Sequence, residues 1–276
     1  MNSPARLLRS MTFRLASAAL GCALAVFSAT AADTPPAISA TDLAAKLSTL
    51  QQDGASYVRL RLEVKQPPGT TKTALQIQIK QRRTRNATEV VYQILWPKER
   101  KGEGILLRKI GDRPATGFYF MPPDTVRAIE MKEPLFGSDL TCEDVIENFF
   151  AWEHQAIVGT EVVDRVNCHI LESKPGKGQR FSSSSVRTWV DTRRIVPLRV
   201  ENYSASGEVL RRIDSTKVAT DDEHRHIPAN LSVRGRRQDS VTDLDGSRIV
   251  HGVAYTDRDF TPEALKELTT PKAASK

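Results

Sequence analysis

The stretch from Tyr57 to Lys65, YVRLRLEVK, decides the fold class of this chain. Its apolar residues Val58, Leu60, Leu62 and Val64 alternate strictly with charged residues. Successive side chains of a β-strand point to opposite faces, so this pattern predicts a strand with one dry and one wet face. Strands of this kind are typical of antiparallel sheets that have water on one side.

The same alternation returns along the chain. Leu75, Ile77 and Ile79 alternate with polar residues and predict a second strand. Further strands are predicted at 89–96, 104–110, 118–121, 157–163, 166–172, 186–191, 196–203, 209–218, 230–236 and 249–255. Turn residues such as Pro175-Gly176, Ser206-Gly207 and Asp245-Gly246 separate them. Evenly spaced short strands predict one large antiparallel sheet that is strongly curved or partly closed.

Helices are predicted at only three places. One begins near Ser39 and carries Leu43 and Leu47 at helical spacing, one covers about 142–152, and a short one covers 262–268. The fold class is therefore mainly β with few helices. The dry concave face of such a sheet must be covered, and we expect the helices to cover it. A loosely fitting cover would leave an apolar pocket.

The first 31 residues resemble a secretory signal peptide. Arg6, Arg9 and Arg14 precede the apolar run 15–27, which ends near the small-residue site Ala29-Thr30-Ala31. The run is shorter than the roughly 20 residues needed to span a bilayer. We therefore expect cleavage after residue 31 and export. Cys22 leaves lipoprotein anchoring open as the less favoured alternative.

The composition excludes a strongly basic nucleic-acid binder. The net charge of +7 falls to +4 when residues 1–31, with their three arginines and no acids, are removed. The remaining arginines are interspersed with acidic residues, so we expect no nucleic-acid partner. Cys142 and Cys168 could pair in an oxidising compartment, and the sequence leaves open whether they form a disulfide.

The acidic stretch from Leu135 to Phe150, LFGSDLTCEDVIENFF, raises the question of catalysis. Thr141 and Asp144 have the spacing of a helix capping box, and Glu143 and Asp144 suit the positive end of a helix dipole. Asp139 also belongs to the cluster. A catalytic acid/base pair would need a histidine or metal nearby, and the segment offers neither. We therefore favour the helix cap over an exported enzyme.

Two other polar clusters are interpreted as surface features. The run from Asp221 to His226 has metal-ligand residue types without a second ligand pair, and a solvated loop is favoured over a metal site. Lys80, Arg82, Arg83 and Arg85 are interpreted as a solvated hairpin end, with contact to acidic lipid head groups or an acidic partner face as the alternative. The chain has no phosphate-loop or dinucleotide-binding motif, so no cofactor is expected.

The segment Gly137–Val145, GSDLTCEDV, resembles the "GSDFSYEDL" signature of the outer membrane lipoprotein-sorting protein family, which is LolA/LolB-like. Further motifs of that family have their counterparts here in the same order: Lys101–Leu107, Phe118–Pro122, Val126–Ile129 and Phe260-Thr261 followed by Leu265. The sequence departs from the family pattern at Phe118, Ala128 and Cys142.

The resemblance implies an incomplete β-barrel whose apolar hollow, covered by helices, holds acyl chains of lipoproteins or other lipids in the periplasm. On this basis residues 32–56 are expected to form a linker and lid helix, 57–268 the half-barrel domain, and 269–276 a flexible tail. The implied function is a non-catalytic carrier between an inner-membrane transporter and an outer-membrane acceptor. An envelope sensor of the same fold that binds a membrane partner is the alternative.

Apolar residues of the predicted strands and helices are the candidate lipid-binding set. The predicted cavity and lid residues are Leu43, Leu47, Val58, Leu60, Leu62, Val64, Leu75, Ile77, Ile79, Phe118, Phe120, Phe149, Phe150 and Trp152.

Overall fold

The structure, a computed structural model, describes residues 38–51, 54–66, 70–84, 86–236 and 239–270. The chain divides into the units Met1–Ala37 and Ile38–Lys276, and all described residues belong to the second unit. The predicted signal peptide (1–31), with Cys22, lies outside the described residues. So do residues 32–37 of the predicted linker and 271–276 of the predicted tail.

Helices are few, as predicted, and most of the chain is strand. The helices and 3-10 turns are α1 (Ala40–Gln51), α2 (Cys142–Ile146), η1 (Lys98–Arg100), η2 (Leu135–Gly137), η3 (Phe149–Ala151), η4 (Asp257–Phe260) and η5 (Glu263–Lys266). The strands are β1 (Ala55–Gln66), β2 (Thr70–Arg83), β3 (Ala87–Trp96), β4 (Gly104–Ile110), β5 (Thr116–Met121), β6 (Thr125–Ala128), β7 (His154–Val163), β8 (Val166–Lys174), β9 (Ser185–Asp191), β10 (Pro197–Tyr203), β11 (Val209–Thr220), β12 (His226–Gly235) and β13 (Val241–His251).

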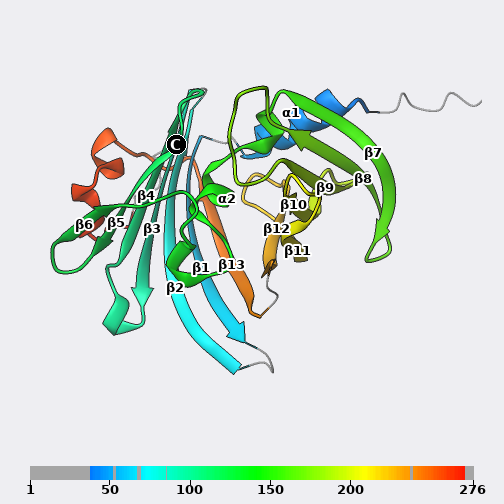
Figure 1. Ribbon diagram of the computed structural model, residues 1–276. Coiled ribbons are helices and arrows are strands. Elements are labelled where there is room, and N and C mark those ends of the chain that lie inside the picture. Colours follow the sequence, from blue (N-terminus) through cyan, green and yellow to red (C-terminus); the bar gives the residue numbers. More distant parts are fainter. Residues whose placement is uncertain (1–37, 52–53, 67–69, 85, 237–238, 271–276) are drawn as a thin grey trace, which may run out of the picture. The chain divides into compact units, whose positions relative to one another are not determined.

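The described strands form one 13-stranded antiparallel sheet with the order β6-β5-β4-β3-β2-β1-β13-β12-β11-β10-β9-β8-β7. The sheet curves strongly, and β6 and β7 are its two edges, so the barrel is incomplete (Figure 1). This arrangement confirms the predicted fold class. Strand β1 lies in the middle of the sheet, because it pairs with β2 on one side and with β13 on the other. The pairing of β1 with β13 joins the first strand of the sheet to the last.

The concave face of β1–β4 is covered by the segment 129–146, which includes η2 and α2. Leu62 and Ile77 of the strands are fully buried and belong to one core cluster with Leu135, Phe136 and Ile146 of this segment. Figure 1 shows α2 inside the curve of the sheet. The chain's own apolar side chains therefore fill this part of the barrel.

Helix α1 packs on the other part of the sheet. Ser39 caps it, since the Ser39 hydroxyl accepts a hydrogen bond from the Asp42 N–H at 3.0 Å. Its apolar face contributes Leu43 and Leu47 to a cluster with Phe150 of η3 and Leu171 of β8. The predicted lid helix thus lies on β7, β8 and η3 and not over β1 and β2.

The C-terminal segment covers the convex face of β3–β5. Phe260 and Leu265 are fully buried there against Val91, Leu106 and Phe120. Beneath the same segment the Lys80 ammonium donates to the Thr269 hydroxyl at 2.5 Å, and Lys80 is only 2% exposed. The interpretation of Lys80 as part of a solvated hairpin end is therefore wrong, because the C-terminal segment returns over this strand.

Two of the predicted helices differ from the structure: one ends earlier than predicted, and the other is not an α-helix. The helix predicted for 142–152 ends at Ile146, because Glu147 has an extended backbone and a separate 3-10 turn follows at Phe149. The Glu147 side chain reaches Lys109 of β4, and Asn148 donates to the Ser48 hydroxyl of α1 at 2.9 Å. These tertiary contacts outweigh the local helical pattern. In place of the helix predicted for 262–268 the structure has the short 3-10 turn η5, and a second 3-10 turn, η4, precedes it.

The last strand lies earlier in the chain than predicted. Asp245-Gly246 was predicted to be a turn before a strand at 249–255, but both residues lie inside β13. A β-bulge interrupts the pairing with β1 between Arg59 and Leu60, opposite this position. A Cβ atom at Gly246 would lie 2.9 Å from the Ala229 carbonyl oxygen, so glycine permits the close approach of β12.

Candidate functional site

The acidic stretch at 137–147 has a structural role. Thr141 caps α2 in a complete capping box, in which the Thr141 N–H donates to the Asp144 carboxylate at 2.6 Å. The Asp144 carboxylate also accepts hydrogen bonds from Arg211 and, at 3.3 Å, from Asn202. The predicted capping box is thus confirmed, and the same carboxylate joins α2 to strands β10 and β11.

Asp139 makes a second set of contacts. Its carboxylate accepts from the Ser240 hydroxyl at 2.6 Å and from the Thr242 hydroxyl at 2.7 Å, and its carbonyl oxygen accepts from Arg211 at 2.6 Å. Asp139 and Asp144 therefore hold the segment 129–146 against β10, β11 and β13. Neither carboxylate has a histidine among these partners, so the contacts explain both acids without catalysis.

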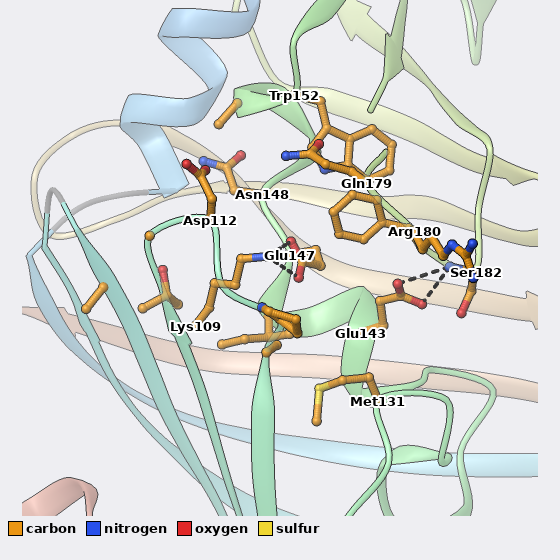
Figure 2. A pocket seen from close by; sticks show the side chains of 18 of the residues that line it. Lys109, Asp112, Met131, Glu143, Glu147, Asn148, Trp152, Gln179, Arg180 and Ser182 are labelled. Carbon is orange, nitrogen blue, oxygen red and sulfur yellow. Dashed lines mark hydrogen bonds and ion pairs between the residues drawn. The ribbon is translucent and has the colours of Figure 1, made fainter. Parts of the chain in front are cut away.

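A cavity of about 900 Å³ lies beside α2 and η3 (Figure 2). Its wall comes from five parts of the chain: residues 84 and 86–88, 109–115, 131–132, 143–153 and 178–182. This volume falls within the roughly 300–1,000 Å³ that is usual for small-molecule sites. The cavity is therefore large enough to be the binding site of an organic ligand.

Aromatic side chains form one side of the cavity. Trp152 and Phe181 line it with their ring centroids 4.8 Å apart. Ile146 and Met131 add further apolar surface to the wall. Phe181 belongs to the loop between β8 and β9, so this pair joins the loop to η3. The wall can take up apolar surface of a ligand.

Charged residues of both signs also line the cavity, and two of them, Lys109 and Glu147, form an ion pair. The Lys109 ammonium lies 2.8 and 3.1 Å from the two carboxylate oxygens of Glu147, and 5.4 Å from the centroid of the Phe181 ring. Burial raises the pKa of the Glu147 carboxyl above its ordinary value. The Lys109 ammonium lowers the pKa and so opposes this rise, and Glu143 adds to it. The Glu143 carboxylate accepts from the Ser182 N–H at 3.0 Å, which holds the β8–β9 loop in place.

The raised pKa of Glu147 has a consequence for stability. A carboxyl whose pKa is higher in the folded than in the unfolded protein makes the folded state less stable as the pH rises above about 4.5. We expect the wild type to lose free energy of unfolding relative to Glu147→Gln between about pH 4 and about pH 8. Denaturant unfolding of both proteins across this range measures the difference. A difference that stays constant, or that grows in favour of the wild type, contradicts the prediction.

The predicted lipid-binding residues fall into three separate clusters. The first cluster is the concave core, which contains the buried residues Leu62, Val64, Leu75 and Ile77 and the partly buried Leu60 and Ile79. Val58 lies on β1, the strand of Leu60 and Leu62. Leu43, Leu47, Phe149 and Phe150 come together in the cluster around α1, and Phe118 and Phe120 lie on the convex face. Of the predicted set, Trp152 lines the cavity of about 900 Å³. Trp152 and Phe149 also line a small neighbouring cavity of about 30 Å³.

Several cavity residues were not predicted from the sequence. Phe181 stands alone beside a serine run in a loop, so no periodic pattern marks it. Lys109 and Glu147 lie far apart in the chain, and only the packing of α2 against β4 brings them together. The only signal for Phe181 in the sequence is that it is an aromatic residue in an otherwise polar loop. A hydropathy pattern does not distinguish such a single residue from chance.

Cys142 and Cys168 are both free and buried. Cys142 lies in the concave core, and Cys168 lies in a different cluster with Trp189. The disulfide that the sequence left open is therefore not formed. Burial raises the pKa of the Cys142 thiol to about 12 and also raises that of Cys168, as expected of unreactive core thiols.

The acidic and histidine-rich loop between β11 and β12 forms an ion network. The Asp221 carboxylate accepts from the backbone N–H groups of Glu223 and Arg225, at 2.9 and 2.8 Å, and also binds the Arg225 guanidinium. His251 contacts both Asp222 and Arg225. Asp221, Asp222 and His251 lie close enough to share a metal ion. The Arg225 guanidinium already supplies a positive charge to this cluster. The contacts therefore account for the grouping of these side chains without a metal ion.

Within the described ranges, none of the helices is long and apolar enough to cross a membrane.

Solved structures with a similar fold define the class of the protein. A DUF1329 family protein from Desulfovibrio piger matches with a TM-score of 0.75 and 20% identity, over 82% of this chain and 97% of that chain. A putative outer membrane lipoprotein-sorting protein domain from Vibrio parahaemolyticus matches with a TM-score of 0.71 and 16% identity, over 81% and 97%. A LolA superfamily protein from Nitrosomonas europaea matches with a TM-score of 0.67 and 19% identity, over 83% and 100%. The chain thus has a LolA-like incomplete-barrel fold, which confirms the resemblance drawn from its motifs.

A family model adds to this result. The model described as "-like: Uncharacterized protein" matches residues 86–267, which is more than half of the chain. The chain belongs to this family. No curated protein matches the chain.

Proposed function

We propose that this protein is a non-catalytic carrier that binds acyl chains of lipoproteins or other lipids. The observation that carries the proposal is the cavity of about 900 Å³ with the Trp152–Phe181 ring contact in its wall, in a LolA-like fold. Transfer of a hydrocarbon chain from water to an apolar site gains about 0.8 kcal/mol per CH₂ group. A cavity with an aromatic wall can therefore hold such a chain without any chemical reaction.

The ligand is proposed to occupy the cavity bounded by β4, η3 and the β8–β9 loop. The strand residues predicted from the sequence, such as Leu62 and Ile77, are covered by the segment 129–146. A contact between these residues and a ligand would require that segment to leave the concave face. Their role in lipid binding stays a prediction, and it concerns a second state of the protein in which the segment has moved.

The carrier proposal includes a location and partners. A protein exported by the predicted signal peptide at residues 1–31 would work in the periplasm, between an inner-membrane donor and an outer-membrane acceptor. The support is the signal-like sequence together with a fold similar to that of a lipoprotein-sorting domain. Native mass spectrometry of protein purified from the periplasm would identify the bound lipid and report whether residues 1–31 have been removed.

The proposed site is tested by a single change in its aromatic wall. We expect Phe181→Ala to bind a neutral apolar fluorophore such as Nile red roughly tenfold more weakly, about 1.4 kcal/mol, because the ligand loses apolar contact. Fluorescence titration of the purified protein measures the change. Phe118→Ala is the matched control, since Phe118 packs on the convex face and should leave the affinity unchanged.

The outcomes separate the alternatives. Binding that is equally weak in the wild type and in Phe181→Ala, with no lipid in the purified protein, would refute the carrier proposal. Stronger weakening by Phe118→Ala than by Phe181→Ala would place the ligand on the opposite face. Recovery of an integral membrane protein in place of lipid would favour the envelope sensor.

A further inference from the structure

Arg83 is a buried arginine whose guanidinium makes no ion pair with any residue that the structure describes. It is the last residue of β2 and is only 9% exposed. Its Nε and Nη1 atoms have no hydrogen-bond partner within the described part of the chain. This corrects the interpretation of Arg83 as part of a solvated hairpin end. Its position in the strand explains the burial, because Arg83 has the same strand parity as Leu75, Ile77 and Ile79 on the concave face.

The neighbouring arginines Arg82 and Arg108, unlike Arg83, form ion pairs with carboxylates. Arg82 lies on the opposite face and pairs with Glu89 and, at 2.9 Å, with Asp257. Arg108 pairs with the same Glu89 at 2.9 Å. Among the described residues, no carboxylate pairs with Arg83. Burial lowers the pKa of Arg83, and the Tyr92 hydroxyl opposes this effect. An unpaired buried charge is strongly destabilising, so an anion at this position would gain a large favourable interaction.

Arg83 lies next to the inner wall of the cavity. The adjacent residue Thr84 and the strand partner Thr88 both line the cavity. On the other side, Tyr92 interacts electrostatically with both Arg83 and Cys142 of α2. Ile146, one turn further along α2, also lines the cavity and belongs to the same core cluster as Tyr92 and Cys142. Arg83 itself does not line the cavity, but residues on both sides of it do.

We propose that the ligand is an anionic amphiphile whose oxyanion, a carboxylate or a phosphate, pairs with Arg83 while its hydrocarbon chain occupies the cavity. This inference rests on the proposed carrier function and names the class of ligand. Contact between the oxyanion and the guanidinium would require a small displacement of the residues that cover Arg83, and α2, a helix of only five residues, is proposed to move. Arg83 then acts as the residue that selects charged ligands over neutral ones, since the aromatic wall can hold either.

The test compares ligands of equal chain length. Laurate, dodecyl phosphate and dodecanol are titrated as competitors against Nile red, with inorganic phosphate as the ligand without a chain. For the wild type we expect the two anionic amphiphiles to bind about 10- to 100-fold more tightly than dodecanol, as a charged hydrogen bond would provide. Inorganic phosphate should not displace the fluorophore, because it makes no contact with the apolar wall.

The variant Arg83→Met should lose this preference and keep its affinity for dodecanol. Its thermal midpoint should stay the same or rise, because methionine removes an unpaired buried charge. Arg83→Lys should retain part of the preference. The matched control is Arg82→Met, which neutralises the adjacent residue on the opposite face and should keep the full preference for anions.

The results distinguish the two proposals. If dodecanol binds but the wild type shows no preference for anions, the inference about Arg83 is overturned and the carrier function stands. If no chain-bearing ligand displaces the fluorophore, both fail. A loss of the preference in Arg82→Met as large as that in Arg83→Met would attribute it to net charge and overturn the inference. If Arg83→Met does not fold, the wild-type comparison and Arg83→Lys still decide the outcome.

Discussion

Replacing Asp144 by alanine should lower the free energy of unfolding by about 3–5 kcal/mol, the usual effect of breaking a buried ion pair. The Asp144 side chain is only 6% exposed and pairs with the Arg211 guanidinium, which is itself 15% exposed. The change also removes the capping box of α2, which contributes about 1 kcal/mol in typical proteins. Urea unfolding followed by circular dichroism measures the loss.

Two further variants test the reason for this effect. Asp112→Ala removes an exposed carboxylate from the wall of the same cavity and should change stability by less than about 0.5 kcal/mol. Asp144→Ala combined with Arg211→Met should be more stable than the sum of the two single changes predicts, because no charge is then left unpaired. A loss below about 1 kcal/mol in Asp144→Ala would show that the network does not hold α2 in place.

Phe260→Ala should destabilise the protein by about 3–5 kcal/mol, as large-to-small changes of buried aromatic residues do. Phe260 is fully buried on the convex face, with its ring centroid 5.3 Å from that of Tyr255. The Arg82 guanidinium carbon lies 4.8 Å from the same ring. The loss should appear in thermal unfolding as a single cooperative transition at lower temperature, because the C-terminal segment is part of the same domain.

Leu268→Ala is the matched control in this segment. Leu268 is 36% exposed, so its truncation should cost less than about 0.5 kcal/mol. If Phe260→Ala instead released the C-terminal segment with little change in the stability of the sheet, limited proteolysis would cut the segment first. That result would contradict the view that this segment completes the core.

The sheet could be predicted from the sequence because strand alternation is a local property. Val58 to Val64 alternate with charged residues, and β1 forms at this position with both neighbours antiparallel to it. The capping box of Thr141 and Asp144 could be predicted for the same reason, since it depends on residues three positions apart. The motifs that resemble the lipoprotein-sorting family indicated the incomplete barrel, and the fold comparison confirmed it.

The location of the cavity could not be predicted. It depends on which chain segments meet. The sequence analysis expected the helices to cover the concave face, and the structure shows that α1 packs on β7 and β8. Phe181 reaches Trp152 because the β8–β9 loop folds back towards η3, and neither residue type indicates this. The burial of Arg83 is another such case, since a run of basic residues at a strand end is usually solvated.

By itself the sequence determined the strands, the helix cap and the class of the fold, because each depends on side chains within a few positions of one another. The tertiary structure alone decided which apolar side chains fill the concave face, where the cavity remains, and that Arg83 is buried near it with no ion-pair partner among the described residues. The physical reason is that burial and electrostatic pairing are set by residues distant in the chain.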